Sequence, residues 1–395
     1  MTARPPIPVD EGAITGLLRT LVAIPSVNPA LVAGGAGEAE IARCLAVECE
    51  RLGMTVSEHE VAPGRPNVVA VLRGVDPARG RSLLLNGHTD TVGAAGMAAP
   101  FVPALRGDRL YGRGASDMKA GLAAMVGAVA AVTAAGGRPR GDVLLTFAID
   151  EEDASIGTAA IAQTHRADAA IVTEPTGLRI CVAHKGFVWA TIRTEGRAAH
   201  GSDYAAGIDA IVRMGRVLHV IDLMDREVLA RRSHPLLGRP SIHASVISGG
   251  EGPSTYPPSC TLVVERRTLP DESVDDVREE LETILAGVRE IDPELRASVE
   301  ITLGRPGLEV DRGADIVRAL DAVAMRRTGK SPEYVGMSPW FDAALLAEAG
   351  IPTVIFGPSG GGWHAEEEYV DLPSVAICAG ILAETIMDFC DSRPD

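Results

Sequence analysis

Several separate apolar segments of the chain each end in a histidine or a carboxylate. These residues are His88 and Asp90 in "LLLNGHTDTV", Asp117 in "YGRGASDMKAG", Asp150, Glu151 and Glu152 in "VLLTFAIDEED", Glu174 in "AAIVTEPT" and His364 in "FGPSGGGWHAEEEYV". Each one alone has an ordinary structural explanation, such as a helix cap or a polar strand end. Because ligands collect beyond the carboxyl ends of strands in an α/β sheet, their joint occurrence predicts one shared site.

This set of residues has the composition of a dinuclear metal site. Imidazole nitrogens and carboxylate oxygens are ligands of Zn²⁺, and a carboxylate can bridge two ions. Three carboxylates against two divalent ions leave a net positive site, which favours a bound hydroxide. One further carboxylate is needed to carry protons, and the adjacent Glu151 and Glu152 can divide these two tasks. The residues therefore predict metal-assisted hydrolysis.

The spacing of His88 and Asp90 has two interpretations. In a strand, residues two positions apart point to the same face. The pair is either a polar strand end at the surface or a metal-binding histidine whose second ring nitrogen is held by a carboxylate. The other carboxylates along the chain favour the metal-binding interpretation.

Strands and helices alternate in the segments that must position these residues. Strands are predicted at "NVVAVLRG", "SLLLNGH", "DVLLTFAID" and "AAIVTEP", with helical segments between them. This alternation predicts a three-layer α/β domain. Between residues 186 and 303 the order becomes β-α-β-β-α-β, which is typical of a ferredoxin-like α+β domain. We therefore predict a discontinuous catalytic domain, 1–185 and 304–395, with an inserted lid or dimerisation domain at 186–303.

The composition of the 395-residue chain argues against several classes of partner. Its formal net charge of −16 argues against nucleic acid and anionic membranes. Its six cysteines are scattered without a CxxC pair, as expected of reduced thiols in a cytoplasm. The N-terminus lacks the apolar core of a signal peptide, and no stretch of about 18 uncharged apolar residues occurs. We expect a cytoplasmic protein with no membrane partner.

Six motifs together resemble those of one family of di-zinc hydrolases. They are "GHTDTV", "YGRGASDMKAG", "DEEDASIGT", "TEPTGL", "AAHGS" and "FGP…HAEEEYV". The family includes acetylornithine deacetylase, succinyl-diaminopimelate desuccinylase, aminoacylase and glutamate carboxypeptidase. The resemblance covers nearly the whole chain. It implies a catalytic domain of the zinc-peptidase type, a homodimer, and two divalent metal ions, with Zn²⁺ expected ahead of Co²⁺ or Mn²⁺.

The resemblance also implies roles for the motif residues. The implied metal ligands are His88 and Glu174 on opposite ions, Asp117 as the bridge, and Glu152 and His364 completing the two sites. Glu151 is the implied general acid and base, and Asp90 would orient His88. A cis peptide bond is implied between Asp117 and Met118.

Three residues of the inserted domain are implied on the substrate side. His200 in "GRAAHGS" would reach the site of the partner subunit and stabilise the developing oxyanion. Arg267 would pair with a substrate carboxylate, although the adjacent Arg266 is an alternative. Ser254 stands where some members have a substrate-binding asparagine, and "PDES" at 270–273 replaces a Pro-Gly-Glu turn. These departures concern selectivity rather than hydrolysis.

The implied reaction is amide hydrolysis of a small N-acyl amino acid with a free carboxylate, as in deacetylases and desuccinylases. A hydroxide held between the two ions would be the nucleophile, with Glu151 as its proton acceptor. A dipeptidase or carboxypeptidase would use the same site on a peptide bond. A non-catalytic, dimeric binding protein is the alternative from another class, and the complete ligand set with Glu151 argues against it.

Overall fold

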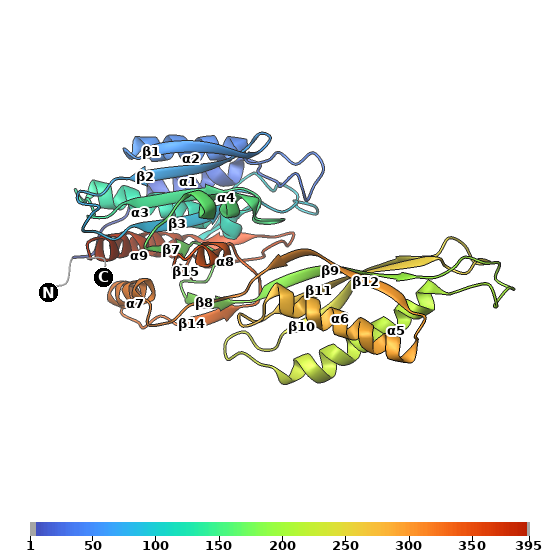
Figure 1. Ribbon diagram of the computed structural model, residues 1–395. Helices are drawn as coiled ribbons and strands as arrows, with labels where there is room; N and C mark the ends of the chain where they lie inside the picture. The colour runs from blue at the N-terminus through green and yellow to red at the C-terminus, as the bar shows by residue number, and fades with distance from the viewer. Residues whose placement is uncertain (1–4, 393–395) are drawn as a thin grey trace. The chain divides into compact units, whose positions relative to one another are not determined.

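The chain divides into two compact units (Figure 1), and the computed structural model describes residues 5–392. Unit 1 comprises residues 5–182, 310–335 and 341–392, and unit 2 comprises residues 183–309 and 336–340. Unit 2 thus extends a few residues beyond the inserted domain that we placed at 186–303. It also includes one segment distant in sequence, 336–340.

The larger sheet has the strand order β1-β2-β6-β3-β7-β15-β8-β13, with β14 pairing beside β8. Its strands are β1 (Thr55–Ala62), β2 (Arg65–Leu72), β3 (Leu83–His88), β6 (Val143–Ala148), β7 (Ala169–Val172), β8 (Ile180–His184), β13 (Leu308–Glu309), β14 (Tyr334–Met337) and β15 (Thr353–Ile355). β3 is parallel to both β6 and β7, and β15 is parallel to β7. The strands β3, β6 and β7 are buried along their whole length, as is usual for parallel strands that are covered on both faces.

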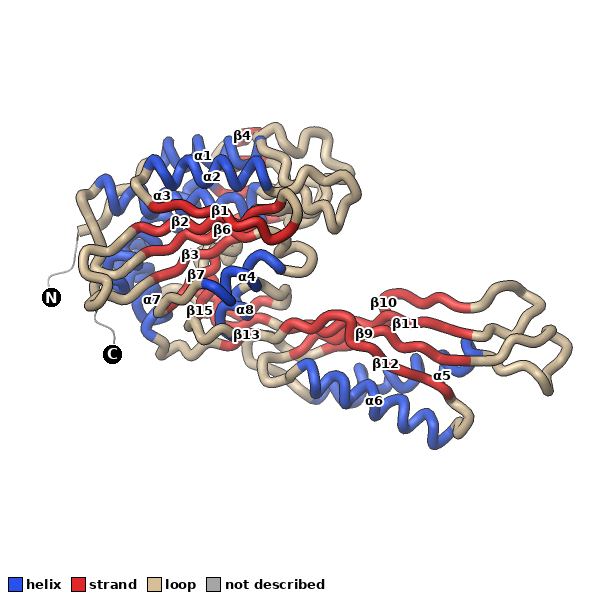
Figure 2. Tube along the Cα trace, turned by 45° about the horizontal axis from the view of Figure 1, so that its top comes forward, coloured by secondary structure: helices blue, strands red, loops and turns tan. Residues whose placement is uncertain are grey.

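Helices cover both faces of this sheet and complete the predicted three-layer α/β architecture (Figure 2). One face carries α1 (Glu11–Ala23), α2 (Ala39–Arg51), α3 (Ala120–Ala134), α7 (Asp315–Thr328) and α9 (Leu372–Cys390), and the other carries α4 (Ile156–Thr164) and α8 (Ala343–Glu348). α3 packs against both α1 and α9. Gly127 of α3 is required for this approach, because a Cβ there would lie 2.6 Å from Ile14 Cγ1.

Two helical segments of unit 1 are long and apolar enough to cross a membrane by length and composition. They are Ala115–Ala134 and Leu372–Cys390, and 78% of each tested window is buried inside the protein. A helix that is apolar all round is also what the core of a large domain requires. Both segments are therefore explained by their place between the sheet and the other helices.

A second, smaller sheet of unit 1 positions the loops near the predicted site. Its strands follow the order β16 (Gly360–Gly361), β17 (Tyr369–Asp371), β5 (Arg109–Tyr111) and β4 (Ala104–Arg106). The loop after β5 enters η1 (Ala115–Lys119), which contains Asp117, and the loop after β16 contains His364. The small sheet therefore places two loops, far apart in sequence, beside each other.

Unit 2 has the predicted ferredoxin-like β-α-β-β-α-β order. Its elements are β9 (Gly186–Glu195), α5 (Ala210–Leu223), η2 (Met224–Val228), η3 (Leu229–Arg231), β10 (Ser241–Gly249), β11 (Ser259–Thr268), α6 (Val274–Ile291) and β12 (Arg296–Arg305). The antiparallel sheet has the order β10-β11-β9-β12, so β10 and β12 are its edges. Val188, Ala190 and Ile192 of β9 pack in the core with residues of α5 and α6. The intervening side chains point to the opposite face of the sheet.

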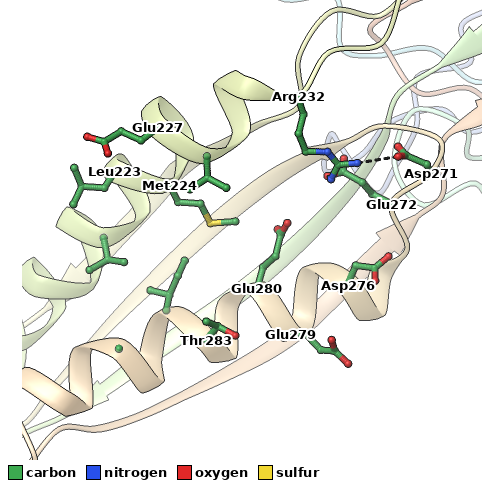
Figure 3. A pocket seen from close by; sticks show the side chains of 14 residues that line it. Leu223, Met224, Glu227, Arg232, Asp271, Glu272, Asp276, Glu279, Glu280 and Thr283 are labelled. Atoms are coloured by element: carbon green, nitrogen blue, oxygen red, sulfur yellow. Dashed lines mark hydrogen bonds and ion pairs between the residues drawn. The ribbon is translucent and has the colours of Figure 1, made fainter.

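An open groove with a volume of about 880 Å³ lies between α5 and α6 in unit 2 (Figure 3). Its walls include the apolar side chains of Leu223 and Met224. At one end Arg232 pairs with Asp271 at 2.9 Å and with Glu272. The groove is therefore lined by apolar helix side chains along its length and by arginine–carboxylate pairs at one end. None of the predicted metal ligands lines it.

Candidate metal centre

Three parallel strands bring four of the predicted residues to one edge of the larger sheet. His88 ends β3, Glu151 and Glu152 follow β6, and Glu174 follows β7. β3 lies between β6 and β7, so these chain ends are adjacent. His88 Nε2 is 3.6 Å from Glu174 Oε1 and 4.0 Å from Glu151 Oε2. The convergence that the sequence predicted is present in unit 1.

Asp117 lies between the two histidines. Its Oδ1 is 3.2 Å from His88 Nε2, and its Oδ2 is 3.4 Å from His364 Nε2. His364 Nε2 is also 3.1 Å from Glu152 Oε2. A carboxylate whose two oxygens face two different sets of ligands has the geometry of a bridge between two cations.

The distances correct one detail of the expected ligand sharing. We expected His88 and Glu174 to ligate opposite ions, but their ligand atoms lie together on the Oδ1 side of Asp117. Glu152 and His364 form the other group, on the Oδ2 side. His88 and Glu174 would therefore share one ion, and Glu152 with His364 would hold the second.

The loop of Asp117 contains a feature that the resemblance implied. The peptide bond between Asp117 and Met118 is cis. Both residues have non-helical backbone angles within η1. This expectation is confirmed.

A buried carboxylate that the sequence analysis missed holds this loop. Glu368 is 1% exposed and accepts hydrogen bonds from the backbone N–H groups of Gly114 and Ser116, each at 2.9 Å, and of Asp117 at 3.0 Å. It also pairs with Arg113 at 2.7 Å. The one signal in the sequence is its position two residues before a buried valine of β17, which places it on the inner face of an extended segment.

Asp90 supports the ligands without reaching the cluster itself. Its carboxylate lies 3.5 Å from His88 Nδ1, and His88 Nδ1 is 3.0 Å from the Asp90 carbonyl oxygen. The same carboxylate accepts the backbone N–H groups of Glu151 at 3.1 Å and Glu152 at 3.2 Å. It also accepts a hydrogen bond from Asn28 at 2.8 Å. Asp90 thus ties the end of β3 to the turn that follows β6.

A second group of supporting residues was also missed. Arg65 of β2 donates to Asn28 Oδ1 at 3.1 Å and to Asp150 Oδ1 at 2.9 Å, and it pairs with Glu38. Asn28 in turn bridges Asp90 and Asp150. One guanidinium therefore balances two buried carboxylates, those of Glu38 and Asp150. The five residues of this network lie in separate segments of the chain, so no local sequence pattern predicts it.

Burial dominates the electrostatics of the cluster. It raises the pKa values of Glu151, Glu174 and Glu152, and the negative charges of neighbouring carboxylates add to this effect. Burial would also raise the pKa of Asp117, but hydrogen bonds to the two histidines hold it below its usual value. Hydrogen bonds with Asp117 and Glu152 raise the pKa of His364 to about 10. The charged forms of the three glutamates are therefore costly in the metal-free protein, and bound cations would stabilise them.

The residues fit a pair of divalent ions. Glu174 Oε2 is buried and accepts no hydrogen bond from any residue that the structure describes. An unpartnered buried carboxylate oxygen costs free energy, and a cation would supply its partner. The five predicted ligands offer imidazole nitrogens and carboxylate oxygens, the donor types that suit Zn²⁺. His88, Asp117 and Glu152, and separately His88, Glu151 and Glu174, place ligand atoms within 4.8 Å of one another.

The three residues that the resemblance implied on the substrate side lie in unit 2. His200 is exposed, and its Nδ1 is 2.7 Å from Ser202 Oγ. Ser254 is also exposed, and its carbonyl oxygen accepts the N–H of Gly201 at 2.7 Å. His200 and Ser254 therefore come from two loops that run side by side.

The two adjacent arginines of β11 face opposite sides of the unit 2 sheet. Arg266 is fully buried and pairs with Glu272 and, at 3.1 Å, with Glu280. The side chain of Arg267 is 33% exposed, pairs with Glu265 at 2.8 Å and lies over the Phe187 ring. Of the two arginines, Arg267 is the one whose guanidinium is accessible.

Comparisons with known proteins identify a family and a fold that this chain resembles. Residues 84–388 match peptidase family M20/M25/M40. The chain is 28% identical over 414 residues to an N-formyl-4-amino-5-aminomethyl-2-methylpyrimidine deformylase of Halalkalibacterium halodurans, covering 97% of this chain and 96% of that protein. It is 30% identical over 336 residues to acetylornithine deacetylase of Myxococcus xanthus, covering 83% and 85%. Its fold is similar to that of the Bacillus subtilis YXEP protein, a dinuclear metal-binding peptidase, with a TM-score of 0.74 and 16% identity over 97% and 99% of the two chains.

The family match includes every predicted metal ligand, from His88 to His364, and both relatives align over more than four fifths of the chain. The resemblance drawn from the sequence motifs is thereby confirmed. The protein is a metal-dependent amidohydrolase, and the chain belongs to peptidase family M20/M25/M40.

Proposed function

We propose that the protein hydrolyses the amide bond of a small N-acyl amino acid, in the manner of a deacetylase or desuccinylase, with two divalent ions at the cluster of unit 1. Zn²⁺ is the first candidate, followed by Co²⁺ and Mn²⁺. The observation that carries the proposal is the complete set of five ligands with an additional carboxylate, Glu151, placed 4.0 Å from His88.

Glu151 is the proposed general acid and base. When bound, the two ions would activate a water molecule and polarise the scissile carbonyl group. The carboxylate of Glu151 takes the proton of the attacking water and delivers it to the leaving amine. Burial raises the pKa of this carboxyl above its ordinary value, and a general acid and base works best when its pKa lies near the operating pH. The hydrogen bond from its backbone N–H to Asp90 holds it in place.

The accessible guanidinium of Arg267 supports a substrate with a free carboxylate. Arginine binds carboxylates through two parallel hydrogen bonds, and the second arginine of this strand, Arg266, is committed to buried glutamates. The similarity to an acetylornithine deacetylase supports the same substrate class.

A second candidate is an N-formylated heteroaromatic amine. The pairing of Arg267 with Glu265 partly neutralises this guanidinium. The rings of Phe187 and Trp189 lie 5.1 Å apart on the same face of the sheet, and Trp189 is 37% exposed. This face therefore offers aromatic surface as well as charge, which suits a planar ligand. The similarity to a pyrimidine deformylase supports this candidate.

A panel of substrates tests these proposals. The metal-loaded protein is assayed with N-acetyl and N-succinyl amino acids, an N-formylaminomethyl pyrimidine, and dipeptides, and the metal-free protein is the control. We expect the highest kcat/KM for an N-acyl amino acid, and we expect Arg267→Ala to raise KM for that substrate. A preference for the pyrimidine that is insensitive to Arg267→Ala would favour the second candidate. A preference for dipeptides would identify a peptidase, and hydrolysis of none would contradict the proposal.

We also propose that the protein is a cytoplasmic homodimer. β10 is an edge of the unit 2 sheet, and its Val246 and Ile247 are 60% and 52% exposed. An exposed apolar edge strand is a surface on which a second chain can pair. In such a dimer, the exposed His200 would act as an oxyanion donor in the site of the partner subunit.

A further inference from the structure

The two proposed ion positions differ in how firmly their histidines are held. The side chain of His88 is 1% exposed, whereas that of His364 is 55% exposed. His88 ends a buried strand, but His364 lies in a loop and has a positive φ of 59°. A residue other than glycine keeps such a conformation only where its surroundings hold it. The loop around His364 must therefore be anchored.

Two hydrogen bonds anchor this loop, one on each side of His364. Before it, Trp363 Nε1 donates to Ser116 Oγ at 3.1 Å. After it, Arg113 Nη2 donates to the carbonyl oxygen of Ala365 at 2.9 Å. Both partners belong to the loop that carries Asp117. Together with the bonds that Glu368 makes to the same loop, this pair of bonds limits the distance between the bridging carboxylate and the exposed histidine.

Ser116 is a rigid partner for the indole. It is 1% exposed, and its backbone N–H is held by Glu368 at 2.9 Å. A Cβ on Gly360 would lie 2.3 Å from Ser116 Oγ, so the glycine allows the His364 loop to approach this hydroxyl closely. Because the backbone of Ser116 is buried and held in this way, the indole N–H donates to an acceptor on a fixed part of the chain.

We propose that Trp363 is a positioning residue for the ion held by Glu152 and His364. Its N–H···Oγ bond to Ser116 holds the exposed histidine at the distance that the shared ion requires. This inference rests on the proposed dinuclear site. Trp363 acts through the backbone next to His364 and not by contact with the reacting atoms. Residues behind metal ligands typically change metal affinity by about 10- to 100-fold when they are removed.

Metal titration of the apo protein tests the inference directly. Isothermal titration with Zn²⁺ and with Co²⁺ measures two binding events in the wild type. Trp363→Phe keeps an aromatic ring but loses the N–H, and Ser116→Ala removes the acceptor. We expect each variant to bind one ion with wild-type affinity and the other about 10-fold more weakly or worse. Because both variants break the same bond, the double variant should be no weaker than either single variant.

Trp340→Phe is the matched control, because it removes another indole N–H, bonded to Pro306 in unit 2 at 2.9 Å, and should leave both affinities unchanged. Two wild-type affinities in Trp363→Phe, or losses that add in the double variant, would overturn the proposal. An equal weakening of both ions with a lower melting temperature of the apo protein would show a merely structural role. If Trp363→Phe fails to fold, Ser116→Ala decides the question. A wild type that binds fewer than two ions would instead refute the dinuclear site itself.

Discussion

At the scale of single residues, the partners of Glu151 and Glu152 separate the tasks of two adjacent carboxylates. Glu152 lies 3.1 Å from His364, within the group that would hold one ion. Glu151 approaches His88 only to 4.0 Å, so its carboxylate is close to the cluster but free to exchange a proton. Both backbone N–H groups are fixed by the carboxylate of Asp90. The two neighbouring glutamates therefore differ in the histidine that each approaches and in the distance to it: His364 at 3.1 Å for Glu152, and His88 at 4.0 Å for Glu151.

Replacing each glutamate in turn should separate catalysis from metal binding. Glu151→Gln keeps the shape of the side chain but cannot accept a proton, so we expect kcat to fall by at least about 10²-fold. Its metal content should stay at two ions per chain, as measured by elemental analysis. Glu152→Gln is the control and should lose one ion, because it removes a charged ligand. Near-normal turnover of Glu151→Gln at full metal content would show that another group moves the proton.

At the scale of elements, strand ends set the buried half of the cluster and loops set its exposed half. His88 and Glu174 are placed by β3 and β7, whose parallel pairing leaves little freedom. Asp117 and His364 lie in loops, and their positions depend on the hydrogen bonds that join the loops. Glu368 makes most of these bonds, with three backbone N–H groups and a paired arginine around one carboxylate.

Two adjacent glutamates offer a matched test of this clamp. Glu368→Gln removes a buried charge from its paired arginine, and we expect the free energy of unfolding to fall by about 3 kcal/mol. Glu367→Gln removes a pair with Arg106 in which both side chains are more than 60% exposed, so its effect should stay below about 1 kcal/mol. Urea unfolding of the metal-free proteins measures both values. Similar values for the two variants would mean that Glu368 does not hold the loop.

The sequence predicted the elements and the ligands because both leave local patterns. Buried strands read as apolar runs, and the ligand of each strand follows its run directly, as with His88 after "LLLNG". The supporting residues leave no such pattern. Asn28 and Arg65 act on a site formed far along the chain, and their roles appear only once the sheet is assembled. The sequence also left Arg266 as an alternative to Arg267, because the two-residue period of a strand places neighbours on opposite faces without showing which face is buried.

At the scale of the whole molecule, each unit has a core of its own and each carries part of the predicted chemistry. The metal ligands belong to unit 1, whereas His200, Ser254 and Arg267 belong to unit 2. The helices α5 and α6 close the unit 2 core on one face of its sheet. β10 stands at the end of the strand order, and most of its residues are exposed. The sequence of one chain does not show how two chains pair, and the candidate surface that the structure offers is this exposed edge. The dimer and the role of His200 must therefore be tested together.

Mixed dimers can show whether His200 acts in the partner subunit. The Glu151→Gln and His200→Ala proteins should each be nearly inactive, the second because loss of an oxyanion donor costs about 10²–10³ in rate. After subunit exchange, a hybrid contains one site that combines Glu151 of one chain with His200 of the other. With about half of the dimers hybrid, the mixture should recover about a quarter of wild-type activity. Action within one subunit predicts no recovery, because every site of the hybrid then lacks one of the two residues. Val246→Lys in both chains places a charge on the β10 edge, so it should abolish the recovery and shift the sedimentation coefficient to that of a monomer.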